Sequence, residues 1–321
     1  RHFEAVAKTY GVWPRAALIY KRGEASHGMA YREALRVAES ADLLITRSGR
    51  IDKLAELFER PAKRVFIDGN PGATQVGFAC GDEAFRMLDR YQHLFTMGLN
   101  IGRADNRLPT GGRQWHPIHR PIVLSHWPTQ PAAGGGRFTT ISTWRGRATF
   151  DWRGQASGEK ADNWLAFLDL PARTNQTFEI ALRMSGADAP DDRQMFQRHG
   201  WRLADPKTLS TLDDYRRYIS RSRAEFSVAH NRYVAFETGW FSDRSAVYLA
   251  SGRPVLVQST GIEEHLPTGA GLLTFKTIDE AIAGVESLNG DYSAHCQVAR
   301  DIAEGYFDSD RVLSRMLERV T

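Results

Sequence analysis

Residues 237–261 read ETGWFSDRSAVYLASGRPVLVQSTG and predict a loop, a short helix and a buried strand, in that order. The loop ends in Ser242, Asp243, Arg244 and Ser245, directly before the helix. One interpretation is a capped helix, because Ser and Asp are favoured N-caps, with Arg244 as a solvated charge. The other is an anion site, in which free helix N–H groups, both hydroxyls and the Arg244 guanidinium bind a phosphate. Asp243 would then face sugar hydroxyls, since it repels phosphate.

The segments around this stretch alternate between strand and helix patterns. In the second half of the chain, strands are predicted at residues 138–143, 178–183, 201–203, 224–229, 254–258 and 271–275. Helices are predicted at 163–167, 194–199, 211–222, 278–288 and 293–319, the last one broken near 306–310. Such alternation is typical of a parallel sheet with helices on both faces.

The first half shows the same alternation, with strands predicted at 17–20, 43–46, 64–68 and 93–97 and helices at 31–41 and 52–60. Residues 120–137 contain three prolines and the triple glycine 134–136, which is typical of a linker. We therefore expect an α/β protein of two Rossmann-like, doubly wound domains, 1–132 and 133–321, that face a cleft. The last helix is expected to pack back on the first domain. The chain begins at Arg1 within a helical pattern, so we expect the first domain to lack its natural start.

Composition excludes several classes of protein. The 321 residues are 42% hydrophobic and 25% charged, which is typical of a globular chain rather than a disordered one. The net charge of +4 suits an anionic ligand but does not indicate nucleic acid. Cys80 and Cys296 form neither a disulfide framework nor a metal motif, and no apolar run reaches the roughly 18 residues of a membrane span. We expect a cytoplasmic protein without a transmembrane segment.

Two further stretches of the second half carry polar side chains after predicted strands. Residues 142–146, STWRG, form the loop after the first strand, where doubly wound domains often hold phosphate. Trp144, Arg145 and Lys160 are the candidates there; the alternative is a core tryptophan with two surface charges. Residues 226–230, FSVAH, form the end of the fourth predicted strand, and Ser227 and His230 there are candidates to contact a nucleobase. The alternative for them is an ordinary core strand.

In the first half, Asp68 and Asn100 lie in Gly-containing turns after predicted strands, at the expected cleft edge of the sheet. Both residue types are also common in turns for purely local reasons. His27 lies in a predicted loop and, with Asp68, is a candidate catalytic base, although a surface or capping histidine is the ordinary alternative. No His, Cys or Glu cluster has the spacing of metal ligands.

The stretch from 224 to 288 resembles the donor-binding half of glycosyltransferases with the GT-B fold, similar to families 1 and 4. The ending Ala-Ser-Gly-Arg-Pro-Val at 250–255 and the pattern GLLTFKTIDEA at 271–281 carry the resemblance. It implies a nucleotide-diphosphate sugar as donor, UDP being an expected nucleotide, with a small molecule or glycan as acceptor and no metal or other cofactor. It places residues 242–245, Trp144, Arg145 and Lys160 at the diphosphate and residues 226–230 near the nucleobase. Thr260 and Gly261 then approach the donor sugar.

The sequence departs from the family pattern in its acidic residues. Retaining members often carry two glutamates around this helix, but the position eight after Glu237 is Ser245. The His and Glu of inverting plant-type members are missing as well. A hexosyltransferase-like enzyme is therefore expected without a choice between retention and inversion. Two alternatives remain open: a non-catalytic protein of this fold that binds a nucleotide, a sugar or a partner, and a nucleotide-sugar epimerase. The oligomeric state is not predicted.

Overall fold

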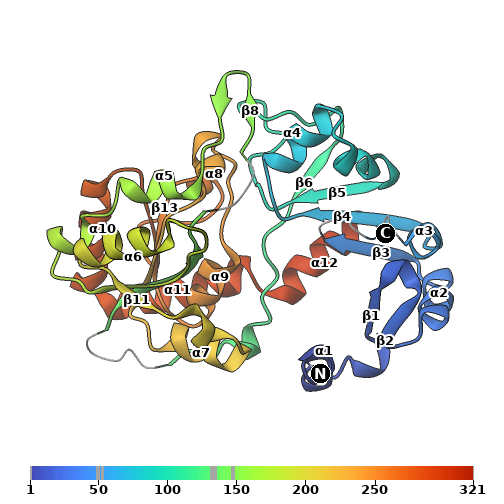
Figure 1. The fold of residues 1–321 in the computed structure, drawn as a ribbon, viewed down its shortest axis with the longest axis horizontal. Coiled ribbons are helices and arrows are strands. Elements are labelled where there is room, and N and C mark those ends of the chain that lie inside the picture. Colours follow the sequence, from blue (N-terminus) through green and yellow to red (C-terminus); the bar gives the residue numbers. More distant parts are fainter. Residues whose placement is uncertain (1, 48–50, 52–53, 131–135, 146–148, 321) are drawn as a thin grey trace.

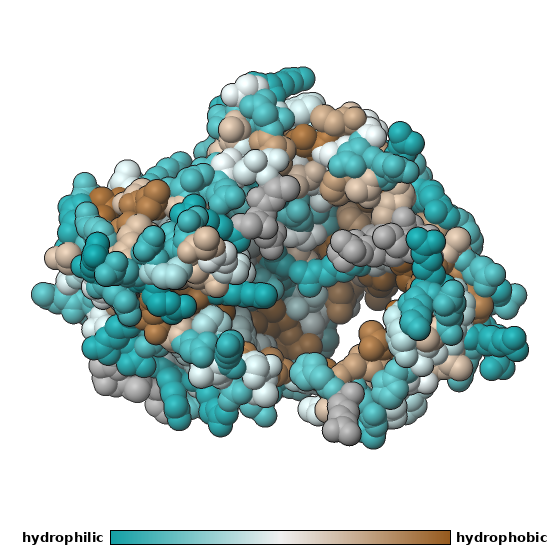
Figure 2. Space-filling model, viewed as in Figure 1, coloured by the Kyte–Doolittle hydropathy of each residue, from teal (hydrophilic) through white to brown (hydrophobic). Residues whose placement is uncertain are grey.

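A computed structural model describes residues 2–47, 51, 54–130, 136–145 and 149–320. The expected domain boundary at 132/133 lies outside these residues. The chain forms two α/β units beside each other, each built on a parallel sheet (Figure 1). On the face shown in Figure 2, the surface is mostly hydrophilic and is hollowed between the two units. Within the described ranges, no helix is long and apolar enough to cross a membrane.

The second domain contains a six-stranded sheet in which every neighbouring pair is parallel. Its spatial order is β11-β10-β7-β12-β13-β14. The chain therefore builds outward from β7 in one direction, returns, and continues in the other, as in a Rossmann sheet. The strands are β7 (Phe138–Thr143), β10 (Phe178–Arg183), β11 (Arg202–Ala204), β12 (Ala224–Ser227), β13 (Val255–Gln258) and β14 (Leu272–Phe275).

Helices cover both faces of this sheet because its strands are apolar on both sides, as expected for a buried parallel sheet. One core contains Phe138, Phe178 and Phe226 with residues of α5, α6 and α10, and the other contains Val255 and Val257 with residues of α9 and α11. The helices are α5 (Lys160–Leu165), α6 (Ala189–Arg198), α7 (Leu212–Ser220), α8 (Asn231–Ala235), α9 (Asp243–Ala250), α10 (Ile278–Gly290) and α11 (Tyr292–Tyr306).

The first domain contains a four-stranded parallel sheet in the simple order β3-β4-β5-β6. Its strands are β3 (Leu43–Arg47), β4 (Lys63–Asp68), β5 (His93–Thr96) and β6 (Trp115–Pro117), and its helices are α2 (Tyr31–Glu39), α3 (Ala55–Glu59) and α4 (Ala73–Ala79). Side chains alternate along β4, so Phe66 joins the core beside α4 whereas Val65 and Ile67 face α12 (Ser309–Val320). The final helix thus crosses back from the second domain and covers one face of the first sheet (Figure 1).

The N-terminal strand differs from its prediction. The sequence predicts residues 17–20 as part of the first parallel sheet, but β1 (Ala17–Tyr20) pairs antiparallel with β2 (Ala25–Gly28) in a separate two-stranded sheet, next to α1 (His2–Thr9). The reason is the turn between them, where Lys21, Arg22 and Gly23 all have positive φ and reverse the chain at once. A crossover to a parallel neighbour would need a longer connection.

A small hairpin projects from the second domain toward the first. Strands β8 (Asp151–Trp152) and β9 (Gln155–Ala156) follow the loop after β7 (Figure 1). Trp152 Nε1 donates to the carbonyl oxygen of Arg107 at 3.0 Å, and the Phe150 ring stacks on Phe236 with 5.5 Å between centroids. The segment between β7 and α5 therefore contacts both domains above the cleft.

Candidate functional site

A pocket of about 380 Å³ opens where the strand order of the second sheet reverses. Its lining comes from the end of β7 and the loop after it, the start of α5, the end of β10, the segments after β11 and β12, α8 with the loop after it, and the start of α9. Every lining residue lies between 141 and 244. The volume is in the range of small-molecule sites. Ligands of open α/β sheets bind at this reversal, beyond the carboxyl ends of the strands, because the adjacent loops separate there.

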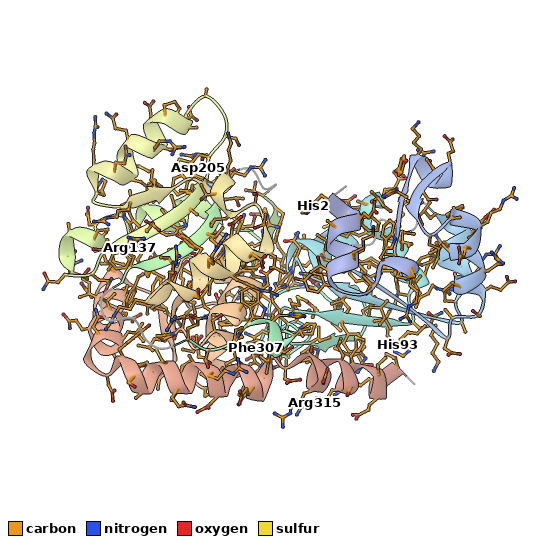
Figure 3. The ribbon with its side chains drawn as sticks, turned by 90° about the horizontal axis from the view of Figure 1, so that it is seen from below. His2, His93, Arg137, Asp205, Phe307 and Arg315 are labelled. Atoms are coloured by element: carbon orange, nitrogen blue, oxygen red, sulfur yellow. The ribbon has the colours of Figure 1, made fainter. Side chains whose placement is uncertain are left out.

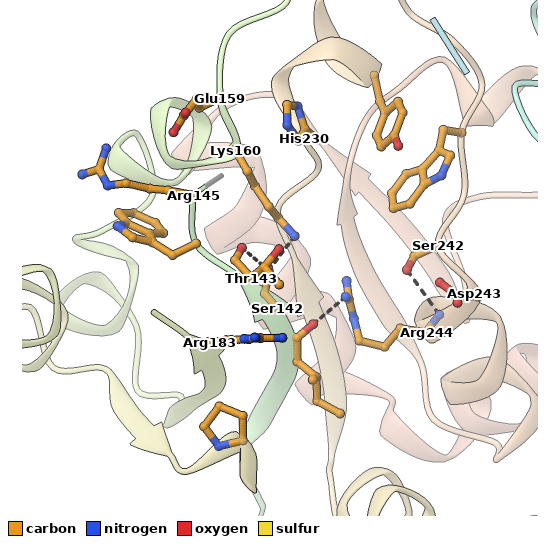
Figure 4. Close-up of a pocket in the computed structure, with 15 residues that line it drawn as sticks. Ser142, Thr143, Arg145, Glu159, Lys160, Arg183, His230, Ser242, Asp243 and Arg244 are labelled. Carbon is orange, nitrogen blue, oxygen red and sulfur yellow. Dashed lines mark hydrogen bonds between the residues drawn. The ribbon is translucent and has the colours of Figure 1, made fainter. Parts of the chain in front are cut away.

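Lys160 brings a positive charge into this pocket (Figure 4). It is the first residue of α5, and its Nζ donates to Ser142 Oγ at the end of β7, at 2.6 Å. The strand end and the helix start are thereby joined under the pocket. The ammonium group adds a positive charge to the lining of the pocket, and such a charge attracts an anionic ligand.

The start of α9 faces the pocket from the opposite side. Ser242 is its N-cap, and Ser242 Oγ accepts from the Arg244 N–H at 3.2 Å. Asp243 follows in the first turn and lines the pocket. Burial opposes ionisation of the Asp243 carboxyl, but the nearby guanidinium groups of Arg120, Arg244 and Arg47 outweigh it and hold its pKa below the usual value. Asp243 is therefore a carboxylate that can accept from ligand hydroxyls.

The Arg244 side chain points from α9 toward β7 and β12, below the pocket, and not into solvent. Its side chain is 13% exposed, and its Nε is hydrogen-bonded to the carboxylate of Glu225 on β12, which is fully buried. Its two Nη atoms donate to the Ile141 carbonyl oxygen and to Ser227 Oγ, each at 2.6 Å. The guanidinium thus joins α9 to β7 and β12, and it contributes positive charge to the pocket floor while bonded to the protein.

Trp144 and Arg145 lie at one side of the pocket. The Trp144 ring is buried against Phe196, with 5.0 Å between centroids, and the Arg145 guanidinium lies 5.4 Å from the Trp144 ring. Arg145 binds the Asp192 carboxylate through two nitrogens, at 3.3 and 3.1 Å, and this bond raises its pKa. Arg145 is therefore half-exposed at the rim and paired with a neighbouring helix. Gly146, the last residue of this loop, lies outside the described residues.

The structure separates the other second-domain candidates. His230 lines the pocket and caps α8, where its Nδ1 accepts from the Arg232 N–H at 3.4 Å. Ser227, Ser245 and Thr260 are buried behind the start of α9, around a second, much smaller cavity. Gly261 lies at the domain interface, where its carbonyl oxygen accepts from Asn100 Nδ2 at 3.3 Å.

The two candidate bases of the first domain are not part of the pocket lining. Asp68 is buried, and its carboxylate accepts from the Asn70 N–H, Thr74 Oγ1, Gln75 Nε2 and Thr96 Oγ1 at 2.7–3.0 Å. These four bonds fix the turn after β4, so we assign Asp68 no role as a base. His27 is on β2, not in the predicted loop, and its Nε2 lies 3.3 Å from Glu4 Oε2 of α1. It is part of the N-terminal hairpin.

Sequence reasoning overlooked several lining residues. Arg183 ends β10 and Pro206 follows β11, while Tyr233 and Trp240 come from α8 and the loop after it. Tyr233 and Trp240 stack with 4.4 Å between ring centroids. Arg183 could have been found, because it ends a predicted strand and the carboxyl ends of parallel strands share one edge of the sheet. The stacked pair has no such local signal. Among the described residues, no group of three or more His, Cys, Asp or Glu could hold a metal ion.

Comparison with known proteins gives the fold a name. No protein-family model matches the sequence, and no curated protein matches it. Several solved structures are similar to this chain. One is HepE from Anabaena in complex with UDP and glucose, which is 13% identical and has a TM-score of 0.54. The match covers 90% of this chain and 80% of that chain. Sucrose-phosphate synthase from Thermosynechococcus elongatus is 12% identical with a TM-score of 0.54 over 86% of this chain and 72% of that one.

A third match is AviGT4, a glycosyltransferase involved in avilamycin A biosynthesis, at 14% identity and a TM-score of 0.51, over 90% of this chain and 76% of that chain. The chain has the GT-B fold. At 12–14% identity this likeness establishes the fold alone.

Proposed function

We propose that the protein is a metal-independent glycosyltransferase that transfers a sugar from a nucleotide-diphosphate sugar to a small-molecule or glycan acceptor. The observation that carries this proposal is the pocket at the sheet reversal, which joins Lys160 and the N-terminus of α9 around one cavity. HepE has been solved with UDP-glucose, at 14% identity and a TM-score of 0.57. A UDP-sugar is therefore the first donor to test here.

The pocket offers separate groups for the parts of such a donor. The diphosphate is assigned to Lys160, the free N–H groups of α9 and the Ser242 hydroxyl, because a positive charge and helix N–H groups converge on it. The Asp243 carboxylate is assigned to ribose or sugar hydroxyls. Arg183 and His230 line the remaining walls, where the nucleobase is expected.

The proposed chemistry requires the leaving diphosphate to be stabilised as its bond to the sugar breaks. Fixed N–H donors and a lysine ammonium perform this task without reorganising during the reaction, which is why electrostatic stabilisation of this kind is effective. The buried ion pair of Arg244 and Glu225 holds the start of α9 against β7 and β12. It therefore keeps these donors in place.

Binding can be tested directly by calorimetry and thermal unfolding with UDP, UDP-glucose and uridine. We expect UDP to stabilise the protein, by about 2.7 kcal/mol at a hundredfold its Kd. Lys160→Gln should weaken UDP binding about tenfold and change uridine binding little, since uridine lacks the charged group. Arg198→Gln, which removes an exposed positive charge from the end of α6, is the matched control and should bind UDP as the unaltered protein does.

The absence of stabilisation by any nucleotide or nucleotide-sugar would refute the donor site. If Lys160→Gln weakens the binding of UDP and of uridine equally, Lys160 maintains the shape of the pocket and does not contact the diphosphate.

A non-catalytic nucleotide-sugar binder is a second candidate, and one observation favours it. The described lining of the pocket comes from the second domain only, and the candidate base Asp68 has all its oxygens engaged. Release of free UDP from UDP-sugars, measured with and without an acceptor mixture, separates the two functions. Tight donor binding with no release under any condition would favour the binder.

A further inference from the structure

A second pocket lies at the place where the chain passes between the domains. It measures about 400 Å³ and is formed by the ends of β5 and β6, residues 117–119 and one side of α12. Beside it, the Ile122 N–H donates to the Phe307 carbonyl oxygen at 2.7 Å, and the Ser309 N–H donates to the Ile122 carbonyl oxygen at 2.9 Å. We call this cavity the crossing pocket, because both connections between the domains border it. Figure 3 shows Phe307 at the junction of α11 and α12 and Arg315 further along α12.

The floor of the crossing pocket is apolar. Phe95, Ile118 and Met316 line it and belong to the core between the first sheet and α12. These side chains are at most 5% exposed, so the floor is a fixed surface rather than a set of mobile side chains. A hydrocarbon chain or ring would lose water by entering it, which favours binding by roughly 25 cal/mol for each Å² of apolar surface removed from water.

The rim of the same pocket is cationic. Arg315 and Arg319 lie one turn apart on α12 and line the cavity together with Glu318, which leaves one net positive charge. Within the described part of the chain, neither arginine forms a hydrogen bond or an ion pair. Exposed guanidinium groups without a partner can bind a carboxylate or phosphate through two hydrogen bonds.

His119 also lines the crossing pocket. Its ring packs edge-on against Tyr306 and Phe307, with 5.8 and 5.7 Å between centroids, and its nitrogens have no hydrogen-bond partner among the described residues. Burial, with smaller contributions from His265 and Arg315, lowers the pKa of His119 to about 4. The imidazole is therefore neutral near pH 7, and it offers the pocket one donor and one acceptor.

We propose that the crossing pocket binds a small amphiphilic anion, a hydrocarbon chain or ring that carries one carboxylate or phosphate. The apolar part lies on Phe95, Ile118 and Met316, and the anionic group lies between Arg315 and Arg319. This site is separate from the proposed donor pocket. Its occupant would contact residues 117–119, directly before Arg120, whose Nε donates to the Phe241 carbonyl oxygen next to the N-cap of α9.

Calorimetry on the full chain tests the proposal with octanoate, octyl phosphate, octanol and acetate. We expect both octyl anions to bind, octanol at least tenfold more weakly because it lacks the charge, and acetate at least tenfold more weakly because it lacks the tail. The double substitution Arg315→Gln and Arg319→Gln should raise the Kd for octanoate at least tenfold. Arg311→Gln removes an equal charge from α12 outside the pocket and should change the Kd less than twofold.

Because all three arginines are exposed, their glutamine variants should fold, which thermal unfolding without ligand will verify. The proposal is overturned if neither octyl anion binds better than acetate, or if octanol binds as well as octanoate. It is also overturned if the double variant binds octanoate as the unaltered protein does. Binding to anionic phosphatidylserine vesicles without any binding of the soluble octyl anions would indicate a membrane surface and would equally contradict the pocket.

Discussion

Arg244 shows how a single residue can serve a site without facing its ligand. Its sequence position, two residues after a helix cap, fits a phosphate contact. In the structure its guanidinium is bonded to Glu225, to Ser227 and to the Ile141 carbonyl oxygen. A buried carboxylate is stable as an ion only while its partner is present, because water cannot solvate it. Arg244 therefore fixes the elements whose ends form the pocket.

Removing this guanidinium should destabilise the whole second domain. Arg244→Met leaves Glu225 buried without a cation, and we expect a loss of about 3–5 kcal/mol in the free energy of unfolding, measured with urea. Replacing both members, Arg244→Met with Glu225→Leu, should recover much of this loss because no charge stays unpaired. If the single variant unfolds at the same urea concentration as the unaltered protein, the pair does not hold the domain together.

At the scale of elements, the junction between the last two helices decides how the domains are joined. The sequence predicts one long helix broken near 306–310, and the structure confirms the break: α11 ends at Tyr306 and α12 begins at Ser309. Phe307, between them, stacks on Phe241 and packs against His119. The break turns the apolar face of α12, with Val312, Met316 and Val320, onto the first sheet.

A pair of substitutions on α12 tests whether this face contributes to stability. Met316 is 2% exposed, and Met316→Ala should cost about 2–5 kcal/mol through lost contacts and a cavity. Leu313, on the same helix, is 36% exposed, and Leu313→Ala should change stability by no more than about 0.5–1 kcal/mol. Chemical unfolding of both variants gives the comparison. Similar losses at the two positions would mean that α12 is not held by its apolar face.

At the scale of the whole molecule, the loop that contains Asn100 is one of the places where the two domains are hydrogen-bonded to each other. Asn100 N donates to the Thr238 carbonyl oxygen at 3.1 Å, and its side chain donates to the Glu237 carbonyl oxygen at 2.7 Å and to that of Gly261. Its Oδ1 lies 2.7 Å from His265 Nε2. Gly261 has φ of 77°, and a Cβ there would lie 2.6 Å from Asn100 Nδ2, so this close approach requires glycine.

Asn100 should therefore limit opening between the domains. We expect Asn100→Ala to increase amide exchange in residues 237–240 and 261–265, with a stability loss of about 1–3 kcal/mol from the unpaired buried groups. Asn289→Ala is the control, because the Asn289 side chain bonds to Arg223 and Gln176 on the surface of the second domain. Unchanged exchange in the two segments of the Asn100 variant would show that the interface does not depend on this side chain.

The positions of the strands at 178–183 and 64–68 could be predicted from the sequence, because buried strands are marked by short apolar runs. Residues 178–183 and 64–68 are strands in both the prediction and the structure, since buried parallel strands need apolar side chains on both faces. Strand partners were not predictable for residues 17–20, because the turn at Lys21 to Gly23 sends the chain back into a hairpin. Its two non-glycine residues adopt positive φ without any sequence signal that would announce it.

The sequence by itself determined the alternation of strands and helices, and hence the α/β class, because local apolar patterns and turn residues suffice for it. It also indicated that Ser242 caps a helix, since capping depends only on neighbouring backbone groups. Only the tertiary structure decided which charges reach the pocket. Arg145 pairs with Asp192, which is 47 residues away in the sequence, and Arg244 pairs with Glu225, which is 19 residues away. Whether a charged side chain is available to a ligand depends on such distant partners.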